Sequence, residues 1–141
     1  MRLKELLFGG AQISGAAANI GFLALRVWTG LSLALAHGLG KVPPSEKFVA
    51  GVVELGFPLP ALFAWAAGLS ELLGGILLAL GLATRPASFF IMVTMLVAGL
   101  LRHAADPFSV KEKAFIYAFI AVCFLIVGAG KLSLDSLIRR K

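Results

Sequence analysis

The sequence predicts an all-α integral membrane protein: an up-down bundle of four transmembrane helices, with a short interfacial or re-entrant helix between the first and the second. Three observations support this fold class. Hydrophobic residues make up 60% of the 141 residues and charged residues only 14%, whereas a soluble domain is about half apolar and about a quarter charged. Four apolar segments approach the roughly 20 residues that a bilayer-crossing helix needs. Prolines and glycines stand near the ends of these segments.

Each predicted span is an apolar run with few or no charges. Arg26 interrupts the first span and Glu71 is the only charge in the second, whereas the third and the fourth carry none. Pro60 and Pro86 stand at the starts of the second and third spans, where a helix tolerates proline. The four predicted spans comprise residues 19–39, 60–82, 86–101 and 114–130.

The segments outside the spans carry predictions of their own. Residues 1–18 are predicted to form an N-terminal surface segment, because the apolar run after "MRLKE" is too short for a signal peptide and ends at Gly9. Ser45 can cap a short helix that has one apolar side. That helix is too short to span, so we expect residues 45–56 to lie in the interface or to dip into the bundle as a lid. Residues 19–137 then form the membrane domain, and residues 138–141 a basic tail.

The distribution of basic residues predicts the orientation. Residues 83–85 are the whole connection between the second and third spans, which must therefore form an antiparallel hairpin. With four spans, both termini face the same side. Because basic residues concentrate on the cytoplasmic side, we expect a multi-pass protein of the inner (plasma) membrane with both termini in the cytoplasm. The side of the termini carries Arg2, Lys4, Arg85, Lys131, Arg139, Arg140 and Lys141, against Lys41, Lys47, Arg102, Lys111 and Lys113 on the other.

Arg26 and Glu71 are the informative residues, because a bare charge at mid-bilayer costs about 2.5–3.5 kcal/mol on insertion scales. Glu71 is the midpoint of its span, and Arg26 lies within about three residues of the middle of the first span, roughly 4 Å along a helix. We therefore expect them to meet as a bidentate ion pair between antiparallel helices. Two interpretations stay open: a structural ion pair that fixes helix register, or a pair that takes part in binding or proton transfer.

A second group of polar residues is predicted at the outer ends of the spans. His37 lies near the outer end of the first span and His103 at that of the third, so alternating spans put both on one membrane side. Lys41, Arg102 and Glu54 fall on the same side. This arrangement predicts a polar mouth leading down to the ion pair. Either histidine could instead be an interfacial or solvated helix-end residue.

The candidate site residues follow from this arrangement. Trp28 and Tyr117 could contact a ring ligand, although aromatic residues of membrane helices are more often packing or interfacial residues. The candidate catalytic residues are Glu71, Arg26 and His37, and the candidate substrate-binding residues are Trp28, Lys41, Glu54, His103 and Tyr117.

The composition also excludes several classes of site. The single cysteine, Cys123, excludes an internal disulfide framework, a CxxC redox pair and a cysteine-rich zinc site. Two histidines are too few for a zinc site without carboxylates, so we predict no metal site. The basic residues are scattered and lie mostly at segment ends, which is typical of membrane-flanking charge and not of a nucleic-acid-binding surface.

Five stretches together form a recognisable pattern. Four are "LRVWTGLSLALAHGLGK", "ELGFPLP", "AAGLSELLGGILLALGLATRPAS" and "GAGKLSLDSL", and the fifth is His103 after the third span. In their order and spacing they resemble the DoxX family of small four-helix membrane proteins, over about residues 20–137. Some relatives in that family are described as quinone-linked membrane oxidoreductase subunits, and others are associated with oxidative-stress or sulfur-redox assemblies.

The resemblance implies a quinone-interacting subunit of a membrane redox complex, in which the chain would form part of a quinone-linked oxidoreductase. The expected cofactor is quinone, with nothing bound covalently, and electrons would pass through the quinone or a partner protein. Two alternatives stay open: a proton-coupled transporter of small molecules or lipids, and a non-catalytic membrane scaffold for soluble redox enzymes. Candidate partners are the lipid bilayer, redox proteins and further copies of this chain, without nucleic acid.

Overall fold

The computed structural model describes residues 3–140, and their side chains except at positions 4, 6 and 140; all regular structure in this part of the chain is helical. The first long helix consists of α2 (Ala16–Ser32), the π-helical segment η1 (Leu33–Gly38) and the 3-10 turn η2 (Leu39–Lys41). The other long helices are α4 (Pro60–Leu80), α5 (Thr84–Val97) with its π-helical extension η3 (Ala98–Arg102), and α6 (Phe108–Val127). The short helices are α1 (Leu3–Phe8), α3 (Glu46–Glu54) and α7 (Leu134–Arg140).

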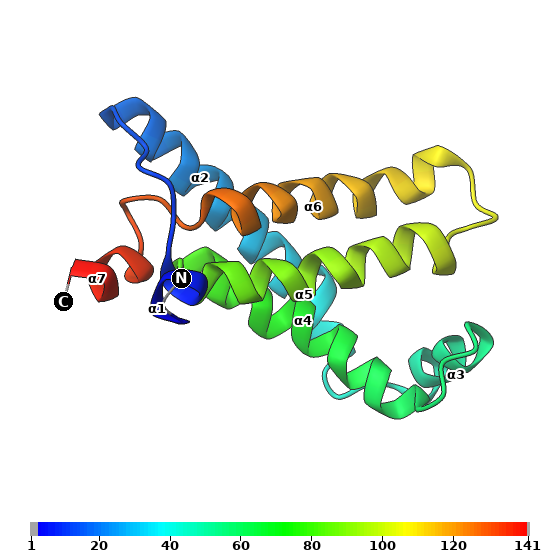
Figure 1. The fold of residues 1–141 in the computed structure, drawn as a ribbon. Helices are drawn as coiled ribbons and strands as arrows, with labels where there is room; N and C mark the ends of the chain where they lie inside the picture. Colours follow the sequence, from blue (N-terminus) through cyan, green and yellow to red (C-terminus); the bar gives the residue numbers. More distant parts are fainter. Residues whose placement is uncertain (1–2, 141) are drawn as a thin grey trace.

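The long helices form a bundle in which consecutive members run in opposite directions (Figure 1). Helix α5 packs against both α6 and α4, and α4 also packs against α2 and η1. Helix α3 and the loop between η3 and α6 lie at one end of the bundle, which we call the α3 end. Helices α1 and α7 lie at the opposite end, which we call the terminal end (Figure 1).

Local sequence signals place several helix boundaries correctly. The Ser45 hydroxyl accepts a hydrogen bond from the backbone N–H of Phe48, 3.2 Å away, and so caps α3. Helix α4 begins at Pro60, as predicted, and ends at Gly81, whose φ of 66° requires a left-handed conformation that glycine adopts without strain. Helix α5 begins at Thr84, two residues before the predicted start.

The register between the first long helix and α4 is set by backbone-to-backbone contact at glycines. A Cβ added to Gly30 would lie 2.4 Å from the carbonyl oxygen of Gly75, and one added to Gly75 would lie 2.6 Å from that of Gly30. A Cβ on Gly38 would lie 2.4 Å from the backbone nitrogen of Leu72. Small residues allow this close approach of membrane helices, and any larger side chain at these positions would push the helices apart.

Three helices of the described chain are long and apolar enough to cross a membrane: Ala16–Lys41, Pro60–Leu80 and Thr84–Arg102. Helix α6 has 20 residues, but Lys111, Glu112 and Lys113 occupy its first two turns, so its uncharged part is shorter than predicted for a span. The helical fold class is therefore confirmed with three candidate spans, and the fourth span stays a prediction. Helix α3 packs on α4 at the α3 end.

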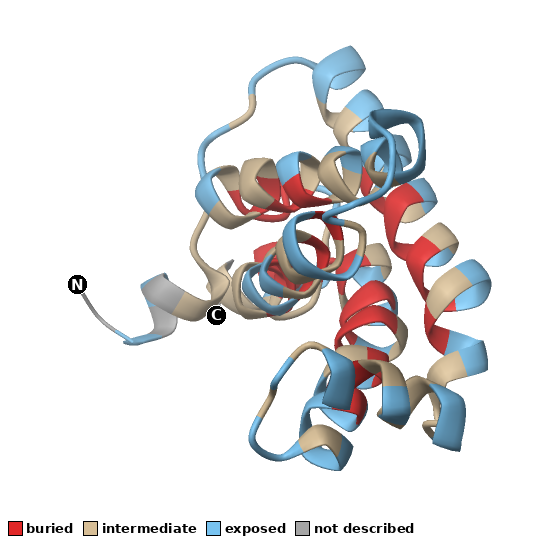
Figure 2. Cartoon of the chain, turned by 90° about the vertical axis from the view of Figure 1, so that its right-hand side faces the viewer, coloured by how far each residue is buried: buried red, intermediate tan, exposed pale blue. Residues whose placement is uncertain are grey.

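The buried residues gather on the faces where the long helices meet (Figure 2). Leu33, Leu78, Ile91 and Phe124 are fully buried and belong to one apolar cluster. The outward faces carry many large apolar side chains, such as Trp28 and Phe119, which are 76% and 72% exposed. A bilayer solvates such side chains, so these exposed faces imply a lipid environment for the bundle.

Candidate functional site

Glu71 forms an ion pair with Lys41. The ammonium of Lys41 lies 2.8 Å and 2.6 Å from the two carboxylate oxygens of Glu71. The Glu71 side chain is 3% exposed and that of Lys41 is 32% exposed, so the pair links the interior of the bundle to its surface. Burial of a carboxylate is costly unless a cation and hydrogen bonds compensate it, and Lys41 supplies both.

This ion pair lies in the wall of a cavity of about 680 Å³ at the α3 end. One wall is helix α3, and the others come from α4, from α5 and from η3. Most lining side chains are apolar, including the aromatic rings of Phe48, Phe57, Phe63 and Phe90. Sites for small molecules in proteins are typically concave, mostly apolar and about 300–1,000 Å³ in volume, with a few fixed polar groups. This cavity has all of these properties.

One π-helical segment borders the cavity and another ends close to it. Segment η1 ends three residues before Lys41, and segment η3 contributes Ala98 and Arg102 to the lining. A π-helical turn is rare and is found frequently at functional sites, because it costs regular hydrogen bonding and re-aims the side chains beside it. Their occurrence on two separate helices at or near one cavity makes this end of the bundle the candidate functional end.

The predicted Arg26–Glu71 ion pair is wrong. A Cβ added to Gly81 would lie 2.5 Å from the guanidinium of Arg26, which places Arg26 beside the end of α4. Gly81 is ten residues beyond Glu71, roughly 15 Å along a helix. The prediction assumed that the midpoints of the two spans lie at the same depth. The glycine contacts instead displace the first long helix along α4, so that Arg26 lies far from Glu71. The predicted mouth leads to Glu71 but not to Arg26.

Arg26 is buried at the terminal end instead, where two of its guanidinium nitrogens contact the C-terminal segment. Its guanidinium donates hydrogen bonds to the backbone carbonyls of Ala129 and, over 2.7 Å, of Leu132. The carboxylate of Asp135 attracts it electrostatically and accepts hydrogen bonds from the backbone N–H groups of Ala83 (2.7 Å) and Thr84 (3.0 Å). A carboxylate at the start of a helix is favourable, so Asp135 caps α5 from 51 residues away in sequence. Arg26 is thus a structural residue.

The predicted aromatic and histidine residues divide between the interior and the surface. The ring of His37 lies 5.7 Å from that of Tyr117, edge to face, and close enough to Glu71 to interact with its charge. Neither ring lines the cavity. Trp28 is exposed on the outward face of α2, away from the cavity. The structure thus does not bring Trp28, His37 or Tyr117 into the lining of the cavity, and a role for them in binding a ring stays a prediction.

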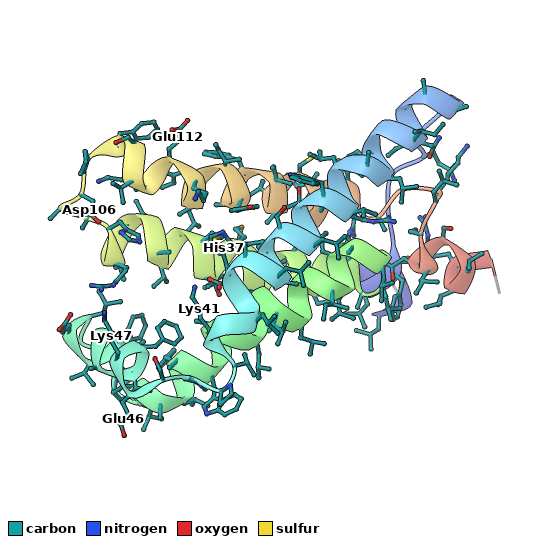
Figure 3. All side chains as sticks on the ribbon, turned by 180° about the vertical axis from the view of Figure 1, so that it is seen from behind. His37, Lys41, Glu46, Lys47, Asp106 and Glu112 are labelled. Carbon is teal, nitrogen blue, oxygen red and sulfur yellow. The ribbon has the colours of Figure 1, made fainter. Side chains whose placement is uncertain are left out.

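The residues predicted for the polar mouth lie together at the α3 end. His103 and Arg102 line the cavity, and the Nδ1 of His103 lies 2.6 Å from a carboxylate oxygen of Asp106. Glu54 does not line the cavity, but its carboxylate lies 3.8 Å from the guanidinium of Arg102. Figure 3 shows Lys41 and Lys47 at this end of the bundle, with His37 deeper along the same helix as Lys41.

Two features of the site were missed from the sequence. Lys41 was predicted as a mouth residue and not as the partner of Glu71, because the register that pairs them depends on glycine contacts between distant segments. Lys47 and the phenylalanines of the cavity were not predicted as site residues either. Phe48 alone had a signal, the apolar side of the capped helix at residues 45–56. No group of three or more metal-binding side chains occurs among residues 3–140, within the side chains described.

The fold and the site define a small helical membrane protein with an apolar cavity at one end and a buried lysine–carboxylate pair in its wall. The family model of DoxX matches residues 21–104. The chain belongs to the DoxX family, as the sequence motifs predicted.

Similarity to individual proteins agrees with this assignment. The chain is 30% identical over 118 residues to a Bacillus subtilis protein named "Putative oxidoreductase CatD", covering 83% of this chain and 86% of that protein. It is 36% identical over 77 residues to an uncharacterised Haemophilus influenzae protein, covering 50% and 58% of the two chains. A second uncharacterised protein of that organism is 28% identical over 137 residues, covering 92% and 90%. No solved structure gives a significant match.

Proposed function

We propose that the cavity at the α3 end binds the ring of a quinone and that the chain is a quinone-interacting subunit of a membrane redox complex. One observation carries the proposal: a buried ion pair, Lys41–Glu71, stands in the wall of an apolar cavity of about 680 Å³. Supporting it, a relative that matches most of this chain has an oxidoreductase name, and the family resemblance points in the same direction.

The lining of the cavity fits a quinone ring. Such a ring has two flat apolar faces and carbonyl oxygens that accept hydrogen bonds. Phe48 and Phe90 offer aromatic surface for the faces. The Lys41 ammonium has three N–H donors and uses two for Glu71, so the third can donate to a ring oxygen. When bound, the quinone supplies two-electron, two-proton redox chemistry, and a partner protein supplies or accepts the electrons.

The chain's own residues position the ring and exclude water. Glu71 holds the Lys41 ammonium in a fixed place, and Lys41 also lies over the ring of Phe48, 5.5 Å from its centroid. The amphipathic helix α3, packed on α4, covers one side of the cavity. In this proposal helix α3 would act as the predicted lid, covering the ligand from one side.

Titration of the purified protein with a short-chain ubiquinone analogue tests the proposal by calorimetry. We expect saturable binding to the unsubstituted protein. In Glu71→Gln the Lys41 ammonium is no longer held in place, so its hydrogen bond to the ring should be lost. A charge-assisted hydrogen bond is worth about 1.5 kcal/mol, so the affinity should fall about tenfold. Glu112→Gln is the matched control, because it makes the same chemical change at an exposed site outside the cavity (Figure 3).

Absence of saturable binding, or equal affinity in all three proteins, would overturn the proposal. Proton-coupled uptake of a solute by vesicles that fails in Glu71→Gln would favour the transporter. If Glu71→Gln abolishes assembly with partner proteins and the unsubstituted protein binds no quinone analogue, the scaffold function would be favoured.

A further inference from the structure

Cations outnumber anions among the polar side chains that line the cavity, which also include the hydroxyls of Ser45 and Thr94 and the imidazole of His103. Three cationic side chains line it, those of Lys41, Lys47 and Arg102, against the single carboxylate of Glu71. Both oxygens of that carboxylate already accept hydrogen bonds from Lys41. The Ser45 hydroxyl accepts one from the backbone of Phe48. A ligand therefore meets an excess of positive charge, and the one carboxylate of the lining is already engaged by Lys41.

The cations at the outer part of the cavity are weakly neutralised. Within residues 3–140 the structure gives Lys47 no ion-pair partner. The guanidinium of Arg102 lies 3.8 Å from the Glu54 carboxylate, too far for a hydrogen bond, and both side chains are more than half exposed. Such an exposed pair is worth little, so the N–H donors of Arg102 stay available to a ligand.

The position of Lys41 strengthens its effect. It is two-thirds buried beside phenylalanine and aliphatic side chains, where the effective dielectric constant is lower than in water, whereas the exposed Lys47 and Arg102 interact more weakly with a ligand charge. A neutral ring would use only one or two donors. An anionic ring would compensate the excess positive charge and engage several donors at once.

From this arrangement we infer that the cavity prefers a ring ligand in its ionised, anionic form, with the negative oxygen held by Lys41 and the rim cations Lys47 and Arg102. This inference rests on the proposed function, because it concerns the charge of the ring and assumes that a ring binds. It names the chemical class as hydroxylated quinones and related acidic phenols that lose a proton at neutral pH.

Four probes separate the contribution of the ligand's charge to binding from the contribution of its ring. The compound 2-hydroxy-1,4-naphthoquinone is a vinylogous acid and anionic at neutral pH, and its methyl ether is neutral; laurate and lauryl alcohol form a matching pair without a ring. Calorimetric titration of the full chain in nanodiscs of zwitterionic lipid measures each affinity. We expect the anionic ring to bind about tenfold more tightly than its methyl ether, which corresponds to about 1.4 kcal/mol.

Variants assign the preference to the rim. Lys47→Gln and Arg102→Gln should each reduce the ratio of the two ring affinities about threefold, the scale of one partly exposed charge. Arg102→Lys should keep most of the ratio, since it keeps the charge. Lys131→Gln is the matched control, because Lys131 is an exposed lysine outside the cavity.

The outcomes distinguish this inference from the proposed function. Equal affinity for the two rings would overturn the inference and leave quinone binding intact. Binding of laurate but of neither ring would overturn the proposed function and, with it, the inference. A ratio that persists unchanged in both rim variants would overturn the assignment of the preference to Lys47 and Arg102.

Discussion

Glu71 is tolerated in an apolar helix because the nearby ammonium of Lys41 compensates its charge and remains partly exposed to solvent. Both carboxylate oxygens receive a hydrogen bond from Lys41, whose side chain reaches the cavity and is one-third exposed. The cost of burying the acid is therefore shared with a partner that keeps part of its hydration. The same arrangement leaves a fixed cationic donor at the cavity wall.

A double-mutant cycle at Lys41 and Glu71 tests this compensation. Lys41→Met alone leaves a buried carboxylate without its partner, whereas the double variant Lys41→Met with Glu71→Gln leaves no charge. We expect the double variant to be more stable than Lys41→Met alone by about 2 kcal/mol, below the range for fully buried pairs because Lys41 is partly exposed. The free energy of unfolding in detergent measures the difference. Additive effects of the two substitutions would show that the side chains do not interact.

At the scale of the elements, the contact between the first long helix and α4 decides which polar residues meet. Gly30 and Gly75 bring the two backbones together, and Gly38 does the same against Leu72. This contact places Lys41 beside Gly68, whose added Cβ would lie 2.8 Å from the Lys41 carbonyl, one turn from Glu71. It also places Arg26 beside Gly81.

Substitution of alanine for glycine on α2 tests whether this contact sets the register. Gly30→Ala puts a methyl group against rigid backbone atoms of α4, and overpacking of this kind costs about 1–3 kcal/mol. Gly21→Ala is the matched control on the same helix, because no atom lies within 4 Å of its added Cβ. We expect the melting temperature in detergent to fall for Gly30→Ala and to stay unchanged or rise for Gly21→Ala. Equal shifts would mean that helix propensity, and not close contact, governs both.

At the scale of the whole molecule, the two ends of the bundle have different tasks. The α3 end holds the cavity, both π-helical segments and the Lys41–Glu71 pair. The terminal end is closed by the chain termini: Ala11 donates to the carbonyl of Val127, and Arg139 donates to that of Gly10. The cavity at one end is thus separated from the structural closure at the other.

The sequence predicts the features that depend on neighbouring residues, and it does not predict those that depend on contacts between distant segments. The cap at Ser45, the start of α4 at Pro60 and its end near Gly81 depend on neighbouring residues, and all three are right. The partners of Arg26 and Glu71 depend on how far one helix slides along another. That displacement comes from glycine contacts between segments some 45 residues apart, so matching span midpoints gave the wrong pair. Asp135 had only a family motif to mark it.

Chemical labelling tests the crossing of α6 and the orientation of the termini. In a Cys123→Ser background, Glu112→Cys and Lys131→Cys each place one thiol at an exposed position just inside or after α6. If α6 crosses with both termini in the cytoplasm, a membrane-impermeant maleimide applied to intact cells should label Glu112→Cys and spare Lys131→Cys until the membrane is permeabilised. Labelling of both would mean that α6 does not cross. Labelling of Lys131→Cys alone would reverse the orientation.

The partnership of Arg26 with the C-terminal segment has a consequence for biosynthesis. Its acceptor at Ala129 emerges 103 residues later, so at about 5–20 residues per second the ribosome needs roughly 5–20 s to deliver it. During that interval the nascent first helix carries a cation without its final acceptors, and the insertion machinery or lipid headgroups must accommodate it. The contacts of Arg26 at the terminal end can form only after residues 129–132 have been translated, which makes synthesis of this segment a checkpoint for assembly.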